Sequence, residues 1–113
     1  MKLNQVKQLL CADILCGNDK SDTEVMSACG CDLMSDVLAF VKDQAMLLTG
    51  LMNPQVVRTA EMMDMKAIVF VRGKRPSDEI ISLADEAGIV VMSTMHPLYV
   101  ACGILYSNGL CNK

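Results

Sequence analysis

The second half of the chain alternates short, charge-free apolar runs with segments of helical periodicity, and this alternation limits the fold more than any other feature. The apolar runs are Ala45–Thr49, Ala67–Val71 and Ile89–Met92. Each is continuous rather than alternately apolar and polar, which is typical of strands covered on both faces of a parallel sheet. The pattern therefore predicts a β-α-β-α-β-α series in an α/β fold, a three-layer α/β/α domain with a mainly parallel sheet.

Helix start and stop signals lie between these runs. Asn53 is a good N-cap, Ser77 precedes two acidic residues that suit a first helical turn, and Gly88 provides a stop. The expected helices are Pro54–Met63, Asp78–Ala87 and Pro97–Ser107. Right-handed crossovers between the strands would bring the three loops that follow them to one end of the sheet.

The first half has a weaker pattern. It predicts a helix over Leu3–Leu10 and strands over Asp13–Cys16 and Glu24–Cys31. A further helix is expected over Leu33–Val41, capped by Asp32, with an apolar stripe formed by Leu33, Val37, Leu38 and Val41. The sequence leaves open whether the two strands join the sheet or form a separate hairpin.

Size and charge exclude several classes of protein. A chain of 113 residues predicts a single domain, residues 1–113. Its formal net charge of −3 argues against a general nucleic-acid binder or a polybasic membrane anchor. No transmembrane segment or export signal is recognisable, so we expect a cytoplasmic protein whose six cysteines are reduced.

The loops after the three apolar runs contain the best candidates for a ligand site. Arg72, Lys74 and Arg75 form the densest basic cluster in an acidic chain, and helix N-termini nearby would favour an anion. We expect a small anionic metabolite, such as a nucleotide, at this end of the sheet. The alternative is a solvated basic loop with ordinary helix caps. The candidate ligand-binding residues are Thr49, Gly50, Asn53, Arg72, Gly73, Lys74, Arg75, Ser93, Thr94 and His96.

Signatures of catalysis are weak. Neither a P-loop nor a dinucleotide-binding glycine pattern occurs. His96 is the only histidine, and a structural role beside Pro97 competes with a general base or ligand. Cys29 and Cys31 form a CxC pair rather than the CxxC of zinc or thioredoxin-like sites. We therefore expect no catalytic residues, metal or cofactor, and keep a thiol or metal enzyme that uses this pair as a minor hypothesis.

The last expected helix, Pro97–Ser107, is apolar on nearly all sides. A helix that is apolar on all sides must be buried on all sides, and packing against the sheet covers only one of them. Tyr99 and Tyr106 share a face, and Gly103 would permit close approach of another helix. We expect a homodimer through these three residues. The alternative is a monomer in which this helix packs under the N-terminal segment.

Several segments resemble the DRTGG domain family. The similar segments are residues 65–73, Pro76 with Asp78 and Glu79, residues 84–94, and, in stand-alone DRTGG proteins of anaerobic Firmicutes, residues 31–39. Residues 65–94 also resemble the N-terminal domain of HPr kinase/phosphorylase. The family's Asp-Arg-Thr-Gly-Gly string is absent, and Thr49-Gly50-Leu51-Met52-Asn53 stands at its approximate place.

This resemblance implies a fold like the N-terminal domains of HPr kinase and Mur ligases. It also implies a regulatory module, since family members accompany CBS, phosphotransacetylase-type or kinase domains and often support oligomerisation. The chain contains no kinase domain, so kinase activity is not expected. We therefore expect a non-catalytic, ligand-sensing dimer. Because stand-alone members tend to lie near iron-only hydrogenase genes, the alternative is an accessory subunit that docks a larger redox enzyme.

Overall fold

A computed structural model describes residues 1–40 and 45–111 of the chain. Its sheet contains five strands in the order β1-β5-β4-β3-β2. Strands β2 to β5 are parallel, and β1 runs antiparallel to β5 at one edge. The expected mainly parallel sheet is therefore confirmed. The strands are β1 (Asp13–Cys16), β2 (Ser27–Gly30), β3 (Ala45–Thr49), β4 (Ala67–Phe70) and β5 (Val90–Ser93).

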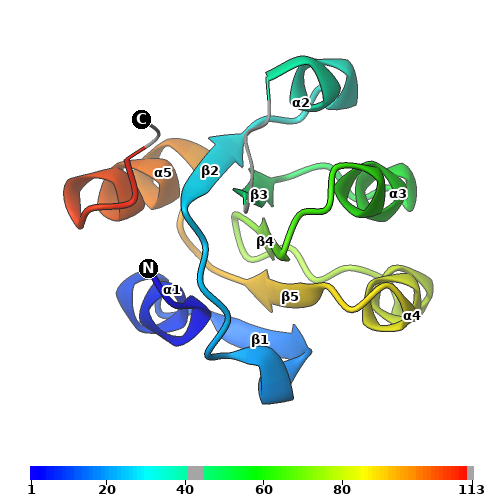
Figure 1. Ribbon diagram of the computed structural model, residues 1–113, viewed down its shortest axis with the longest axis horizontal. Coiled ribbons are helices and arrows are strands. Elements are labelled where there is room, and N and C mark those ends of the chain that lie inside the picture. Colours follow the sequence, from blue (N-terminus) through cyan, green and yellow to red (C-terminus); the bar gives the residue numbers. More distant parts are fainter. Residues whose placement is uncertain (41–44, 112–113) are drawn as a thin grey trace.

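Helices cover both faces of this sheet, which confirms the three-layer α/β/α fold (Figure 1). Helices α2, α3 and α4 lie on one face, as expected for successive right-handed crossovers that step across the sheet in one direction. Helices α1 and α5 lie together on the other face. The helices are α1 (Leu3–Leu10), α2 (Met34–Phe40), α3 (Gln55–Met62), α4 (Asp78–Glu86) and α5 (Leu98–Ser107), with a short 3-10 helix, η1 (Asn18–Lys20).

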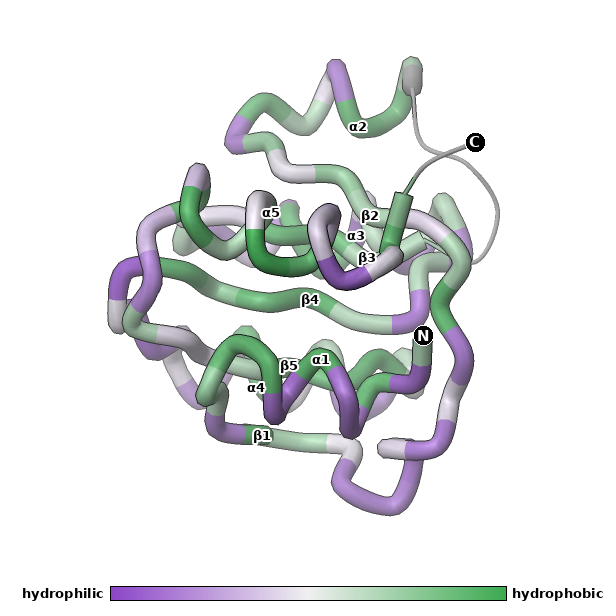
Figure 2. Tube along the Cα trace, turned by 90° about the vertical axis from the view of Figure 1, so that its left-hand side faces the viewer, coloured by the Kyte–Doolittle hydropathy of each residue, from purple (hydrophilic) through white to green (hydrophobic). Residues whose placement is uncertain are grey.

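The three central strands form the core. Every residue of β3, β4 and β5 is buried, as their continuous apolar sequences predict. Figure 2 shows the same character as an unbroken hydrophobic trace along β4. Their side chains alternate between two clusters: Val69 packs with α1 and α5, whereas Ile68 and Phe70 pack with α3 and α4.

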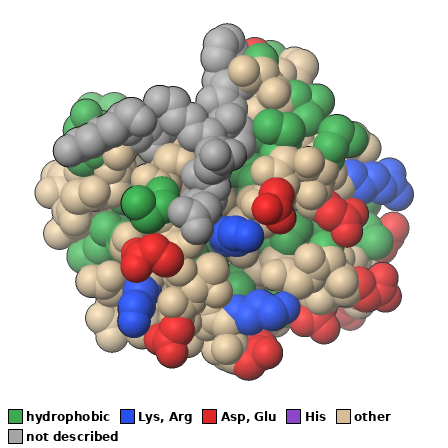
Figure 3. Space-filling view, in the orientation of Figure 1, with side chains coloured by type: hydrophobic (Ala, Val, Ile, Leu, Met, Phe, Trp, Pro, Cys, Tyr) green, Lys and Arg blue, Asp and Glu red, His purple; other side chains and the backbone are tan. Residues whose placement is uncertain are grey.

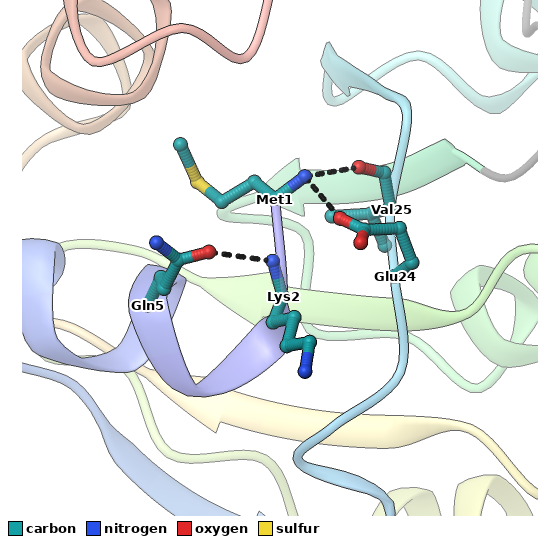
Figure 4. Close-up of polar contacts among 5 residues, drawn as sticks. All are labelled: Met1, Lys2, Gln5, Glu24 and Val25. Carbon is teal, nitrogen blue, oxygen red and sulfur yellow. Dashed lines mark hydrogen bonds and ion pairs between the residues drawn. The ribbon is translucent and has the colours of Figure 1, made fainter.

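The two N-terminal strands join the sheet at its opposite edges rather than forming a hairpin. The second strand is shorter than expected, Ser27–Gly30 instead of Glu24–Cys31. Val25 N–H donates to the Met1 carbonyl, and the Met1 amino group binds the Glu24 carboxylate and the Val25 carbonyl (Figure 4). Residues 24 and 25 are therefore engaged by the start of the chain rather than by β3.

The same close-up shows how α1 begins. Gln5 Oε1 accepts a hydrogen bond of 3.0 Å from the Lys2 N–H, which would otherwise have no partner within the helix (Figure 4). Lys2 also forms an isolated antiparallel bridge with Glu24. The start of α1 is thus joined to the segment that leads into β2.

The expected capping of α2 by Asp32 is wrong. The helix starts at Met34, and the Asp36 and Val37 N–H groups donate to the Leu33 carbonyl. The Asp32 side chain bonds to Thr49 and Gly50 instead. The expected apolar stripe is also wrong in part, because Val37 is buried but Leu33 and Leu38 are exposed. Val41 lies outside the described residues.

Side chains cap the starts of α3 and α4, although α3 begins at Gln55 rather than at the expected Pro54. Asn53 Oδ1 accepts from the Gln55 N–H at 2.8 Å, and Ser77 Oγ accepts from the Ile80 N–H at 3.4 Å. Gly88 follows α4 with a φ of +75°, a left-handed conformation that glycine adopts without steric cost. These caps position the loops that precede α3 and α4.

The distribution of charge on the surface gives little indication of a binding partner. On the face that Figure 3 shows, basic and acidic side chains are interspersed rather than gathered into a patch of one sign. None of the helices in the described ranges combines the length and apolar character that a bilayer crossing requires.

The core assignment predicts a large effect of truncation at the central strand. Phe70 is fully buried on β4, so Phe70→Ala should lower the free energy of unfolding by about 3–5 kcal/mol. Met62→Ala, at a residue that is 70% exposed, is the control and should change it by less than about 0.5 kcal/mol. Urea denaturation measures both values. A loss below about 1 kcal/mol at Phe70 would contradict this core.

Candidate ligand site at the carboxyl ends of the strands

The carboxyl ends of β2 to β5 meet at one end of the sheet, which we call the carboxyl end. The structure brings all ten expected ligand residues to this end. Thr49 ends β3, Gly50 and Asn53 follow it, and residues 72–75 follow β4. Ser93 ends β5, and Thr94 and His96 lie between β5 and α5.

The loop after β4 has an unusual backbone. Arg72 and Gly73 have φ angles of 59° and 69°, so two successive residues are left-handed. For a residue with a side chain this conformation costs about 1–2 kcal/mol. The Arg72 N–H donates to the His96 carbonyl at 2.9 Å, and the Gly73 N–H donates to the Thr94 carbonyl at 2.8 Å. The loop after β5 therefore holds the basic loop in this conformation.

The hydroxyl groups at this end mainly join the loops to one another. Ser93 Oγ donates to the Lys74 carbonyl at 2.8 Å, and Thr94 Oγ1 donates to the Leu10 carbonyl at 2.7 Å. Thr49 Oγ1 donates to Asp32 Oδ1 at 2.8 Å. All three residues are buried, so they hold the loops in place beneath the exposed residues of the site.

The cationic groups converge on Gly50. Lys74 Nζ donates to the Gly50 carbonyl at 3.0 Å. A Cβ atom at position 50 would lie 2.6 Å from Arg72 Nη2, so the guanidinium group occupies the space that the missing side chain leaves. Arg75 instead forms an ion pair with Asp13 at the start of β1. Arg72 and Lys74 are thus the two cations at the centre of the site.

Asp32 is the residue at this site that the sequence analysis assigned to a different role. Its Oδ1 accepts from Thr49 Oγ1 and from the Gly50 N–H, both at 2.8 Å. The Gly50 N–H first, and then the Thr49 hydroxyl, lower the pKa of Asp32, with smaller effects from the charges of Arg72 and Lys74. The only sequence signal was an acidic residue just after a strand, which also fits a helix cap.

Asn53 and His96 lie at the margins of the site. The Asn53 side chain is exposed and its Oδ1 caps α3. The backbone of His96 connects the loops, because its carbonyl accepts from Arg72 and its N–H donates to Thr94 Oγ1 at 3.4 Å. Chemically, the arrangement offers two cations, a backbone N–H and a hydroxyl, a set of groups suited to binding an anion.

The cysteines are free thiols, including the CxC pair. Burial raises the pKa of Cys29, and the neighbouring Cys31 and Cys102 raise it further. A raised pKa keeps the thiol protonated and poorly nucleophilic at neutral pH. Within residues 1–40 and 45–111, no group of three or more His, Cys, Asp or Glu residues could hold a metal ion.

Helix α5 has an exposed surface whose residues differ from those of the candidate ligand site. Ala101 and Leu105 are buried against the sheet, whereas Tyr99 and Tyr106 are 89% and 66% exposed. An open groove of about 420 Å³ runs along this side of α5. Its lining residues are Tyr99, Val100, Cys102, Gly103, Tyr106 and Ser107.

The comparisons with known proteins agree with this architecture. The sequence matches the DRTGG domain family over residues 5–105. One similar solved structure contains the CBS and DRTGG domains of the regulatory region of Clostridium perfringens pyrophosphatase, complexed with the activator diadenosine tetraphosphate. The TM-score is 0.73 at 17% identity, and the match covers 92% of this chain and 45% of that chain. A comparison with curated proteins gives no match.

Fold and site together define a three-layer α/β domain with a basic loop cluster at the carboxyl end of its parallel strands. The chain belongs to the DRTGG domain family, as its sequence resemblance predicted. It spans about half the length of the solved protein that it matches, and at this identity the likeness concerns the fold.

The hydrogen bonds to Asp32 predict a specific pH dependence of stability. The folded state lowers the pKa of Asp32 below its ordinary value of 3.8, so this carboxylate stabilises the fold above that value. The contribution is lost as the pH falls from about 4 through the lowered pKa. Asp32→Asn should therefore reduce stability at pH 7 by about 1 kcal/mol, and the difference from wild type should vanish at strongly acidic pH.

Urea denaturation between pH 2 and pH 7 tests this expectation. Asp36→Asn, the same change at an exposed position in α2, should retain the wild-type pH profile. An equal offset between Asp32→Asn and wild type at every pH would contradict the assignment.

Proposed function

We propose that residues 1–113 form one non-catalytic regulatory domain that binds a small anionic metabolite at the carboxyl end of the sheet and dimerises through α5. The observation that carries the ligand proposal is the left-handed Arg72-Gly73 turn, which is bonded to the loop after β5. Strained non-glycine backbone persists where surrounding structure compensates for it, and such strain is concentrated at functional sites. Here the left-handed turn contains Arg72 and is followed by Lys74, and the cationic groups of both lie at Gly50.

The local charges favour an anion in an acidic chain. Arg75 is compensated by an ion pair with Asp13, whereas Arg72 and Lys74 form no ion pair in the part of the chain that the structure describes, and their charges make only small contributions to the lowered pKa of Asp32. The adjacent Gly50 is buried and has no side chain, which lets the Arg72 guanidinium lie close to its backbone. A phosphoryl group suits such a set of donors.

The solved relative supports a nucleotide as the metabolite. That structure is a regulatory region with CBS and DRTGG domains in complex with a nucleotide activator. A nucleotide contains the phosphoryl groups that Arg72 and Lys74 would bind. The family relationship and the basic loop therefore favour the same class of ligand.

The dimer proposal rests on α5. Tyr99 and Tyr106 bury about 150–250 Å² each when covered, which is a substantial share of the roughly 800 Å² per partner in a standard interface. Gly103 lies between them in the sequence, and a Cβ atom there would have no neighbour within 4 Å. A second copy of α5 can therefore approach closely at this point, and tyrosines of the two copies can pack beside one another.

A thermal-unfolding panel tests the ligand proposal. Nucleotides, nucleotide sugars and phosphorylated metabolites are screened at saturating concentration. A ligand at 100 times its Kd adds about 2.7 kcal/mol to the stability of the native state, which should raise the Tm by about 10 °C. A panel without any shift would refute the proposed site.

Variants then locate the binding. Arg72→Ala with Lys74→Ala should abolish the shift, whereas Arg58→Ala, at an exposed arginine of α3, should preserve it. Gly50→Ala should weaken binding with little loss of stability, because the new Cβ displaces only the flexible end of Arg72. Undiminished binding by the Arg72/Lys74 variant would place the ligand elsewhere.

Sedimentation equilibrium tests the dimer. Tyr99→Glu with Tyr106→Glu should raise the dimer Kd by at least about 30-fold, equivalent to the loss of about 2 kcal/mol at an interface hot spot. Gly103→Leu should also weaken the dimer, since the side chain has room in one copy but obstructs a second helix. Met62→Glu, at an exposed apolar residue of α3, is the control.

The alternative function predicts a different pair of results. A wild-type monomer that responds to no metabolite would contradict both parts of the proposal. Stoichiometric recovery of a larger redox enzyme with such a protein would favour the accessory-subunit hypothesis, with the apolar side of α5 as the contact surface.

A further inference from the structure

The Asp32 carboxylate occupies a set of donors that would also suit a ligand. It comes from the connection between β2 and α2 and reaches the carboxyl end of the neighbouring strand β3. There one oxygen, Oδ1, accepts from both a backbone N–H and a hydroxyl, at 2.8 Å each. A phosphoryl or carboxylate oxygen of a ligand would seek the same two donors.

The two cations of the site lie beside Gly50, whose N–H binds Asp32. Lys74 Nζ bonds to the Gly50 carbonyl, and the Arg72 guanidinium lies over the Gly50 Cα. Both charges act on the Asp32 carboxylate. Gly50 therefore contacts all three charged residues. Its N–H binds Asp32, its carbonyl binds Lys74, and its missing side chain makes room for Arg72.

We propose that Asp32 is an internal anion that fills the binding position, so that the anionic group of a ligand must displace its carboxylate. This inference rests on the proposed function of the carboxyl end as an anion site. A phosphoryl group with about two negative charges competes well with a single carboxylate for Arg72 and Lys74. Asp32 thereby sets the affinity of the site and disfavours weakly charged anions.

The surroundings of Asp32 permit such a displacement. Asp32 and Leu33 are exposed, so the carboxylate can turn into solvent without opening the core. The hydroxyl and the N–H that it leaves belong to the end of β3, which stays buried and paired with β4. The donor set consequently keeps its geometry when Asp32 leaves. The donors are therefore already positioned before the ligand binds.

Isothermal titration calorimetry with inorganic pyrophosphate at pH 7 and low ionic strength tests this inference. Asp32→Ala removes the competing anion and should tighten binding about tenfold or more. Asp32→Asn removes the charge and keeps an oxygen for the two donors, so it should also tighten binding and should disturb the loop less than Asp32→Ala. Asp36→Asn makes the same charge change on α2 and should leave the affinity within about twofold of wild type.

The outcomes separate this inference from the proposed function. Tighter binding by both Asp32 variants supports the inference, also where the wild type binds too weakly to measure. If the wild type binds and the Asp32 variants bind equally or more weakly, the inference is overturned and the anion site stands. If the wild type and all the variants fail to bind, both are overturned. Thermal unfolding of each variant verifies that it is folded.

Discussion

Burial of three charge-free strands on both faces is the constraint on which the rest of the structure depends. Strands β3, β4 and β5 have no polar face, so helices must cover them on both sides. Parallel pairing then sends every connection through a helix and gathers the loops after the strands at one end. The position of the basic loop beside Gly50 and Thr94 follows from this arrangement rather than from any local motif.

The loops at that end are coupled to one another. The loop after β5 holds the left-handed turn at Arg72 and Gly73, and the end of β3 holds Asp32. Their polar groups bind each other wherever they are buried, as buried polar groups must. A ligand at Gly50 would therefore contact groups that are held in place by the ends of three strands.

The regular second half of the fold was predictable from the sequence because its signals are local. Continuous apolar runs, the Asn53 and Ser77 caps and the Gly88 stop each act within a few residues. The shortening of β2 was not predictable, because residues 24 and 25 bond to Met1, which is distant in sequence. The assignment of Asp32 as a helix cap failed for the same reason: its partners, Thr49 and Gly50, lie on a different strand.

Apolar periodicity in the sequence by itself determined the fold class, and residue type determined the basic residues at the carboxyl end. The family followed from the resemblance of whole segments to DRTGG domains rather than from periodicity. Only the tertiary structure decided that β1 and β2 form opposite edges of the sheet and that Asp32 bonds to Thr49 and Gly50. It also decided which side of α5 is left exposed. The physical reason is that strand pairing and side-chain partners depend on long-range packing, which a local pattern does not encode.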